Sequence, residues 1–212
     1  MTLLEDVDAL IEGRRLLDHP FYTKWVEGTL PKEAIQEYTR QYFAFESSFP
    51  RFLSAIHSRT EDPAARQALL ENLWDEEHGR ENHRELWLRF AEGMGVAREE
   101  VESAERNEAT YALVETYTTA CESPASGVAA VHAYERQVPA VAEAKIAGLR
   151  AHYGVDDDRT LAFWKVHEGL DVEHADAERE ILEGSDRERV LEGTQSALDA
   201  WWAFLDAVDV PA

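Results

Sequence analysis

The sequence predicts an all-α fold, a bundle of about seven to eight helices, and a single domain that spans residues 1–212. Apolar residues recur at helical spacing along most of the chain, and proline, glycine and acidic turns separate these periodic segments. The sequence contains no strand-like alternation, no internal repeat and no glycine-rich phosphate loop. At 212 residues the chain is long enough to bury one core and to enclose a cavity.

The first half of the chain is predicted to form four helices. A capping box of Thr2 and Glu5 opens the first helix, and prolines open the other three. Pro50 is expected to kink the third helix, whose aromatic side chains would form core or the wall of a site. The four ranges are residues 2–17, 20–26, 31–56 and 63–92.

The second half is predicted to form four more helices. Residues 122–127 make the clearest loop of the chain, and Pro139 is expected to kink the helix in which it lies. A turn at Gly154 and the acidic residues 156–158 separates the second of these helices from the third. The four ranges are residues 97–121, 128–152, 163–178 and 185–205.

The charge balance excludes several classes of partner. Acidic residues outnumber basic residues by 43 to 21, and the net charge is −22. Such a surface repels phosphate backbones and anionic lipids, so we expect no nucleic-acid or membrane partner. No apolar run reaches the roughly 20 residues of a membrane span, and the acidic N-terminus is unlike a signal peptide. We therefore expect a cytoplasmic protein, and the single Cys121 excludes an internal disulfide.

Residues 163–178 carry the first candidate metal ligands. On a helix of about 100° per residue, His167, Asp171 and His174 would share one stripe. Two imidazoles and a carboxylate suit iron, manganese or zinc, whereas calcium and magnesium prefer oxygen ligands alone. The alternative interpretation is a solvated helix face with two ordinary histidines.

Two other predicted helices supply further candidates. Glu76 and His83 are seven residues apart, which would place them on one face of a single helix. Glu135 lies in the apolar first half of the helix predicted for residues 128–152. Three carboxylates and three imidazoles suit a two-metal site that activates oxygen, because a hydrolytic zinc site needs about half as many ligands. A solvated, charged helix face is the alternative for Glu76 and His83. The competing residues nearby are Glu77, His78 and Glu81.

Five sequence strings resemble the haem-oxygenase-like dimetal oxidases, whose fold group includes TenA and PqqC. The chain is most similar to the branch named after the chlamydial protein associating with death domains. The resemblance extends over residues 19–178, about three quarters of the chain. The strings are H-P-F-Y-T-K-W, Q-Y-F-x-F-x-x-x-F-P-R, E-N-L-W-D-E-E-x-x-x-x-N-H-x-E-L-W, the Y-E of A-Y-E-R-Q-V-P, and H-x-x-x-D-x-x-H.

The resemblance implies a haem-oxygenase-like helical domain that holds two metal ions, Fe/Fe or Fe/Mn, and uses O₂ as co-substrate. The resemblance implies that Glu76, and not the neighbouring Glu77, His78 or Glu81, is the metal ligand. It also implies that the chain makes 4-aminobenzoate for folate synthesis from its own side chains, with Tyr22 as the excised ring and Lys145 as the amine donor. The implied metal ligands are Glu76, His83, Glu135, His167, Asp171 and His174.

The sequence leaves open whether Tyr22 and Lys145 lie near the metal ligands. Tyr22 could instead be a core aromatic, and Lys145 an exposed cation. Lys145 follows Glu135 by ten residues, about 15 Å along a helix, so it reaches the metals only if Pro139 or its own long side chain directs it inward. Burial there would depress the pKa of Lys145 and leave a neutral, nucleophilic amine.

Other functions remain open from sequence alone. Haem oxygenase itself is disfavoured because the ligand set would crowd a haem cavity, and PqqC works without a metal. TenA relies on a cysteine nucleophile, and Cys121 has no matched partner. The alternatives that remain are a dimetal oxidase acting on a separate amino or fatty acid and a non-enzymatic interaction protein. A homodimer is a further open expectation.

The excess of carboxylates over only four lysines is typical of a protein that works in high intracellular salt. We predict that molar salt raises the melting temperature, because screening weakens the repulsion among like charges in the folded state. Thermal unfolding followed at low and at molar salt tests this prediction. An unchanged melting temperature would reject the interpretation.

Overall fold

The computed structural model describes residues 2–167 and 170–209, except for the side chains of residues 170–173. The described residues form thirteen α-helices and one 3₁₀ helix without any strand, so the all-α prediction is confirmed. The capping box of Thr2 and Glu5 opens α1 as predicted. None of the described helices combines the length and apolar character that a bilayer-spanning helix needs. The elements are α1 (Leu3–Gly13), η1 (Leu16–Asp18), α2 (Pro20–Glu27), α3 (Lys32–Glu46), α4 (Phe49–Arg59), α5 (Pro63–Glu77), α6 (His83–Gly93), α7 (Arg98–Glu102), α8 (Glu108–Ala120), α9 (Pro124–Glu135), α10 (Val138–His152), α11 (Asp158–His167), α12 (Leu170–Glu183) and α13 (Arg187–Val208).

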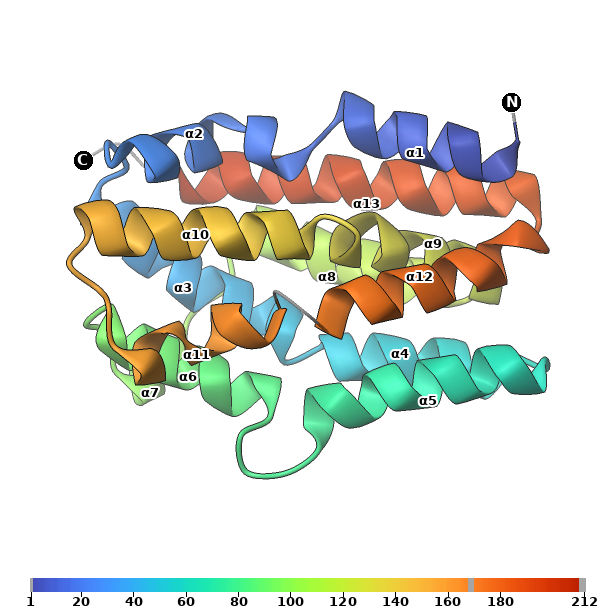
Figure 1. The fold of residues 1–212 in the computed structure, drawn as a ribbon, viewed down its shortest axis with the longest axis horizontal. Helices are drawn as coiled ribbons and strands as arrows, with labels where there is room; N and C mark the ends of the chain where they lie inside the picture. The colour runs from blue at the N-terminus through green and yellow to red at the C-terminus, as the bar shows by residue number, and fades with distance from the viewer. Residues whose placement is uncertain (1, 168–169, 210–212) are drawn as a thin grey trace.

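The helices pack into a layered bundle (Figure 1). The N-terminal α1 lies beside the C-terminal α13 along one side, and α4 and α5 lie together along the opposite side. Helix α13 also packs on α8 and α9, and α12 packs on both α9 and α5. Helix α6 packs on α11 and on α5. The helices that carry the predicted metal ligands, α5, α6, α9, α11 and α12, are therefore neighbours in space.

Four predicted helices are each divided within the described residues, so the predicted number of helices was too low. Prolines cause two of these divisions, because a residue without an N–H fits the first turn of a helix and not its middle. Pro50, Pro124 and Pro139 each lie in the first turn, of α4, α9 and α10 respectively. The kinks expected at Pro50 and Pro139 are thus breaks, and most of the predicted loop 122–127 is helical.

A loop divides the helix predicted for residues 63–92. Helix α5 ends at Glu77, and Gly79 then adopts a left-handed φ of 83°. The Asn82 side chain caps the next helix, α6, by accepting a hydrogen bond from the backbone N–H of Glu85. The chain therefore turns between Glu77 and Asn82 instead of continuing straight.

One more predicted helix is divided in the second half of the chain. In the range 97–121, the Asn107 side chain caps α8 and separates it from the short α7. In the range 163–178, the described residues are helical in α11, which is described up to His167, and in α12, which is described from Leu170. Whether one continuous helix spans this range depends on residues 168 and 169, which lie outside the described residues.

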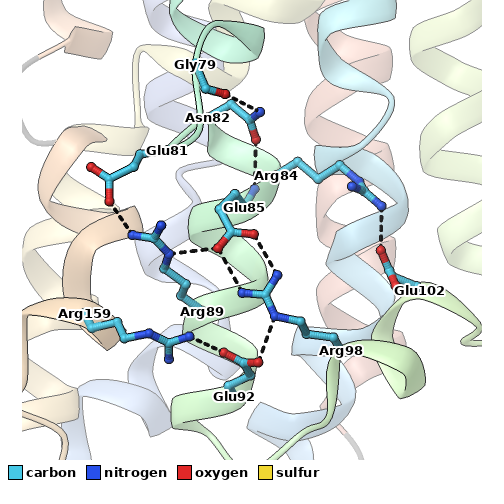
Figure 2. A network of polar contacts seen from close by, with 10 residues as sticks. All are labelled: Gly79, Glu81, Asn82, Arg84, Glu85, Arg89, Glu92, Arg98, Glu102 and Arg159. Atoms are coloured by element: carbon cyan, nitrogen blue, oxygen red, sulfur yellow. Dashed lines mark hydrogen bonds and ion pairs between the residues drawn. The ribbon is translucent and has the colours of Figure 1, made fainter.

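A network of ion pairs on the surface holds α6 against α7 and α11 (Figure 2). Arg98 of α7 contacts Glu85 at 2.7 Å and Glu92 at 2.8 Å, and Arg159 of α11 also pairs with Glu92. Single exposed ion pairs contribute little, but shared partners in a network restrict one another's geometry. The network fixes α6, whose first residue is His83, relative to the neighbouring helices.

Candidate metal centre

Glu76, His83 and His167 form a compact buried cluster. Each offers one ligand atom, and these atoms all lie within 4.8 Å of one another. The Glu76 Oε1 atom lies 2.7 Å from His83 Nδ1, and the rings of His83 and His167 have centroids 4.5 Å apart. The three side chains come from the end of α5, the start of α6 and the end of α11, and none is more than 5% exposed.

The turn between α5 and α6 brings Glu76 and His83 together. The prediction that they share one face of a single helix is wrong, because they belong to two helices joined by that turn. The choice of Glu76 over its neighbours nevertheless agrees with the burial pattern, since Glu76 and His83 point into the interior. The competing residues Glu77, His78 and Glu81 are all exposed.

Hydrogen bonding prepares His167 as a ligand. Its Nδ1 atom lies 2.6 Å from the carbonyl oxygen of Phe163, and a carbonyl can only accept, so Nδ1 carries the proton. The Nε2 lone pair is therefore available to a metal. Burial, followed by the charge of His83, holds the pKa of His167 well below its usual value. The imidazole is neutral, as a metal ligand must be.

The pKa of His83, unlike that of His167, is raised above its usual value. Burial alone would lower the pKa of His83, but the adjacent Glu76 carboxylate outweighs this effect and raises that pKa to about 9. His83 therefore carries a proton near pH 7 when no metal is present. A metal ion must displace this proton to bind there.

Glu135 and His174 form a second group of candidate ligands. The His174 Nδ1 atom lies 4.0 Å from Glu135 Oε1, and both carboxylate oxygens of Glu135 accept hydrogen bonds from Asn72 at 3.0 and 3.1 Å. The other ring nitrogen of His174 lies 3.2 Å from the carboxylate of Asp75. Five of the six predicted ligands thus lie in two adjacent groups, and the side chain of Asp171 lies outside the described residues.

A small cavity connects the two groups. Its volume is about 10 Å³, close to the space of a single water molecule. Glu76 and His167 line it from the first group and Glu135 lines it from the second. The remaining lining residues are Tyr42, Glu46, Phe49 and Tyr134.

The carboxylates around this cavity suit bound cations. Burial, with the nearby charge of Glu76, raises the pKa of Glu46 to about 8, and burial also raises the pKa of Glu135. Carboxylates that cannot all ionise in a dry site can do so once divalent cations replace their protons. Carboxylate and imidazole donors together suit iron and manganese. The residues present therefore fit a two-metal centre.

Lys145 lies in a dry aromatic pocket beside Tyr22. It is 1% exposed, and its Nζ atom lies 5.1 Å from the ring centroid of Tyr22 and 4.0 Å from that of Trp164. The Nζ atom donates a hydrogen bond to the Tyr38 hydroxyl at 2.5 Å. The side chain is thus directed inward from α10, and the alternative of an exposed cation is wrong.

Burial among these aromatic rings shifts the pKa values of Lys145 and Tyr22. Burial holds the pKa of Lys145 well below its usual value, and no carboxylate among the described residues pairs with it to oppose this shift. Burial also raises the pKa of Tyr22, although a hydrogen bond with Tyr38 partly counteracts the effect. A neutral amine and a protonated phenol therefore share one partner, the Tyr38 hydroxyl.

Aromatic side chains join this pocket to the cavity. The rings of Tyr38 and Tyr42 have centroids 5.4 Å apart, and the hydroxyls of Tyr42 and Tyr134 lie 2.5 Å apart. Tyr42 and Tyr134 both line the small cavity. Tyr22 and the candidate ligands are therefore linked through a short series of buried rings.

The sequence patterns did not single out several of these residues, yet helical spacing could have found most of them. Tyr38, Tyr42 and Glu46 follow one another at intervals of four residues along α3, so they share one face. Asn72, which holds Glu135, precedes Glu76 by one turn of α5. Glu46 could have been found because it is an acidic residue within the aromatic stretch of α3, where a charged side chain is unusual.

The model of a family described as iron-containing redox enzymes matches residues 36–208, and the chain belongs to this family. The 4-aminobenzoate synthase of Chlamydia muridarum is 42% identical over 100% of this chain and 92% of its own length. The 4-aminobenzoate synthase of Nitrosomonas europaea is 39% identical, with 98% of this chain and 91% of that protein covered. A TenA homologue from Pseudomonas syringae has the same fold, with a TM-score of 0.83 at 17% identity over 97% of this chain and 90% of that one. The predicted haem-oxygenase-like fold group and redox-enzyme class are confirmed.

We predict that the wild-type chain binds two metal ions and that His167→Ala retains about one. Removal of the imidazole opens the ligand set of one position, and the second group remains intact. Metal analysis after anaerobic reconstitution and desalting measures the stoichiometry. His78→Ala is the matched control, because this exposed histidine lies in the turn between Glu76 and His83 and should leave both ions bound. Two ions retained by His167→Ala would contradict the assignment.

Proposed function

We propose that this chain is a 4-aminobenzoate synthase that uses two metal ions, Fe/Fe or Fe/Mn, with O₂, and that its own Tyr22 supplies the aromatic ring. The name of its relatives, at 39–42% identity over nearly the whole chain, supports the product. The observation that carries the self-derived substrate is the distance of 5.1 Å between Lys145 Nζ and the ring centroid of Tyr22, with both side chains buried.

The chain's own residues would prepare both reactants. When bound, the metal ions supply oxidising power from O₂. The buried rings of Tyr38 and Tyr42 offer a route for an electron to leave Tyr22 toward the cavity. Lys145, held neutral by burial, is then the amine nearest to the oxidised ring. The surrounding aromatic side chains exclude water, which would compete with the amine.

A dimetal oxidase that acts on a separate small molecule is the second candidate. It would need room beside the metals, and the cavity bounded by the described residues has a volume of about 10 Å³. A larger cavity of about 880 Å³ lies elsewhere, lined by residues of α1, α10 and α12 such as Asp8, Ala140 and Arg179. None of the predicted site residues whose side chains are described lines it. The sizes and positions of these two cavities favour the self-derived substrate.

The remaining expectations belong to the same proposal. The chain would act in the cytoplasm, in high intracellular salt, and its product would enter folate synthesis. A homodimer is compatible with this proposal and is not required by it, because all proposed reactants lie within one chain.

We predict that Tyr22 and Lys145 are consumed, with no more than one 4-aminobenzoate formed per chain. The purified chain is supplied with Fe²⁺, reductant and O₂, or with Fe²⁺ and Mn²⁺ together, and intact-mass and peptide analysis then locates the mass lost. Growth with ring-labelled tyrosine should place the label in the product.

The controls are two conservative substitutions. Tyr22→Phe should give neither product nor mass loss at residue 22, because phenylalanine lacks the phenolic O–H that is oxidised. Tyr111→Phe, at a tyrosine that is 58% exposed, should behave as the wild type. An unchanged Tyr22 peptide together with many turnovers of an added substrate would favour the second candidate.

A further inference from the structure

Glu46 is a buried carboxylate that the proposed reaction does not use. It is the last residue of α3 and is 5% exposed, and the Tyr42 hydroxyl donates a hydrogen bond to its carboxylate. Its Oε1 atom is fully buried and has no hydrogen-bond partner among the described residues. An unpaired buried carboxylate oxygen is costly, so a feature of this kind calls for a ligand.

Glu46 stands between the small cavity and the outside. Together with Glu76 it lines the cavity of about 10 Å³, and the same two residues also line a separate pocket of about 340 Å³. The rest of that outer pocket includes the exposed side chains of Glu77 and Arg84. Glu46 and Glu76 thus lie between the outer pocket and the small cavity.

The charges in this outer pocket favour cations. Three acidic side chains, those of Glu46, Glu76 and Glu77, line this pocket together with a single basic one, that of Arg84. Arg84 is already paired with Glu102 at 2.6 Å. A pocket lined by carboxylates in a chain with net charge −22 attracts divalent cations.

We propose that the outer pocket is the access path for divalent metal ions and that Glu46 binds an incoming ion and transfers it to Glu76 and His83. Glu46 is not one of the three residues whose ligand atoms lie within 4.8 Å of one another, and it lines both the outer pocket and the small cavity. A carboxylate oxygen suits Fe²⁺ and Mn²⁺. This inference rests on the proposed two-metal function, because it assumes that ions are bound inside.

The test is the rate at which the chelator-treated full-length chain binds Co²⁺, followed in a stopped-flow instrument through the visible absorbance of the bound ion. Glu46→Gln keeps the size of the side chain, but it replaces an acid that can give up its proton to a metal ion with a neutral amide. We expect the binding rate to fall about tenfold, and to remain lowered in molar salt, where the screening length is about 3 Å.

Two further variants make the result specific. Glu77→Gln removes the same charge from the exposed part of the pocket, and its smaller effect should disappear in molar salt. Ser47→Trp narrows the outer pocket without changing any carboxylate, so it should also slow binding and keeps the proposal testable if Glu46→Gln does not fold. Circular dichroism checks the fold of each variant.

The outcomes separate this inference from the proposed function. If the wild type binds two Co²⁺ ions and Glu46→Gln binds them at the wild-type rate, the access path is overturned and the metal centre stands. Loss of the Glu46→Gln effect in molar salt, as expected for Glu77→Gln, would also overturn it. If the wild type binds no Co²⁺, both the inference and the two-metal function are overturned.

Discussion

The contact between the Glu76 carboxylate and the His83 imidazole, 2.7 Å apart in the interior, is the interaction on which the rest of the structure depends. Charged groups are stable in such a place only if they neutralise one another or share a cation. The turn between α5 and α6 creates the contact, and the network around Glu85 and Glu92 holds α6 in place. His167 at the end of α11 then completes a cluster that metal ions can join.

The same burial produces a second chemical environment nearby. Aromatic rings surround Lys145, and the absence of a carboxylate partner among the described residues leaves its amine neutral. One fold therefore contains a polar pocket for cations and an apolar pocket for an uncharged amine, separated by Tyr38 and Tyr42. The proposed synthase would use the first environment for oxidation and the second for the transfer of the amine.

Much of the fold and of the candidate site could be predicted from sequence, but part of the reasoning was wrong. Apolar periodicity identified the helical class, and the residue types identified donors suited to iron. The spacing argument for Glu76 and His83 assumed one helix, whereas the two residues belong to helices separated by a loop that contains Gly79. Periodicity could not reveal this loop, because a loop between helices leaves the polar pattern intact. Nor could it show that Lys145 points inward, since the path of α10 after Pro139 is set by packing against α2 and α11.

The most direct measurement of the central claim is anaerobic calorimetric titration of the metal-free chain with Fe²⁺ at pH 7, repeated in buffers of different ionisation enthalpy. The pKa of His83, raised to about 9, means that this imidazole is protonated before the metal binds. Metal binding must then release its proton, and the heats in the different buffers count the protons released. The account predicts two ions bound and at least one proton released per chain. A chain that binds no iron, or binds it without releasing a proton, would contradict the account.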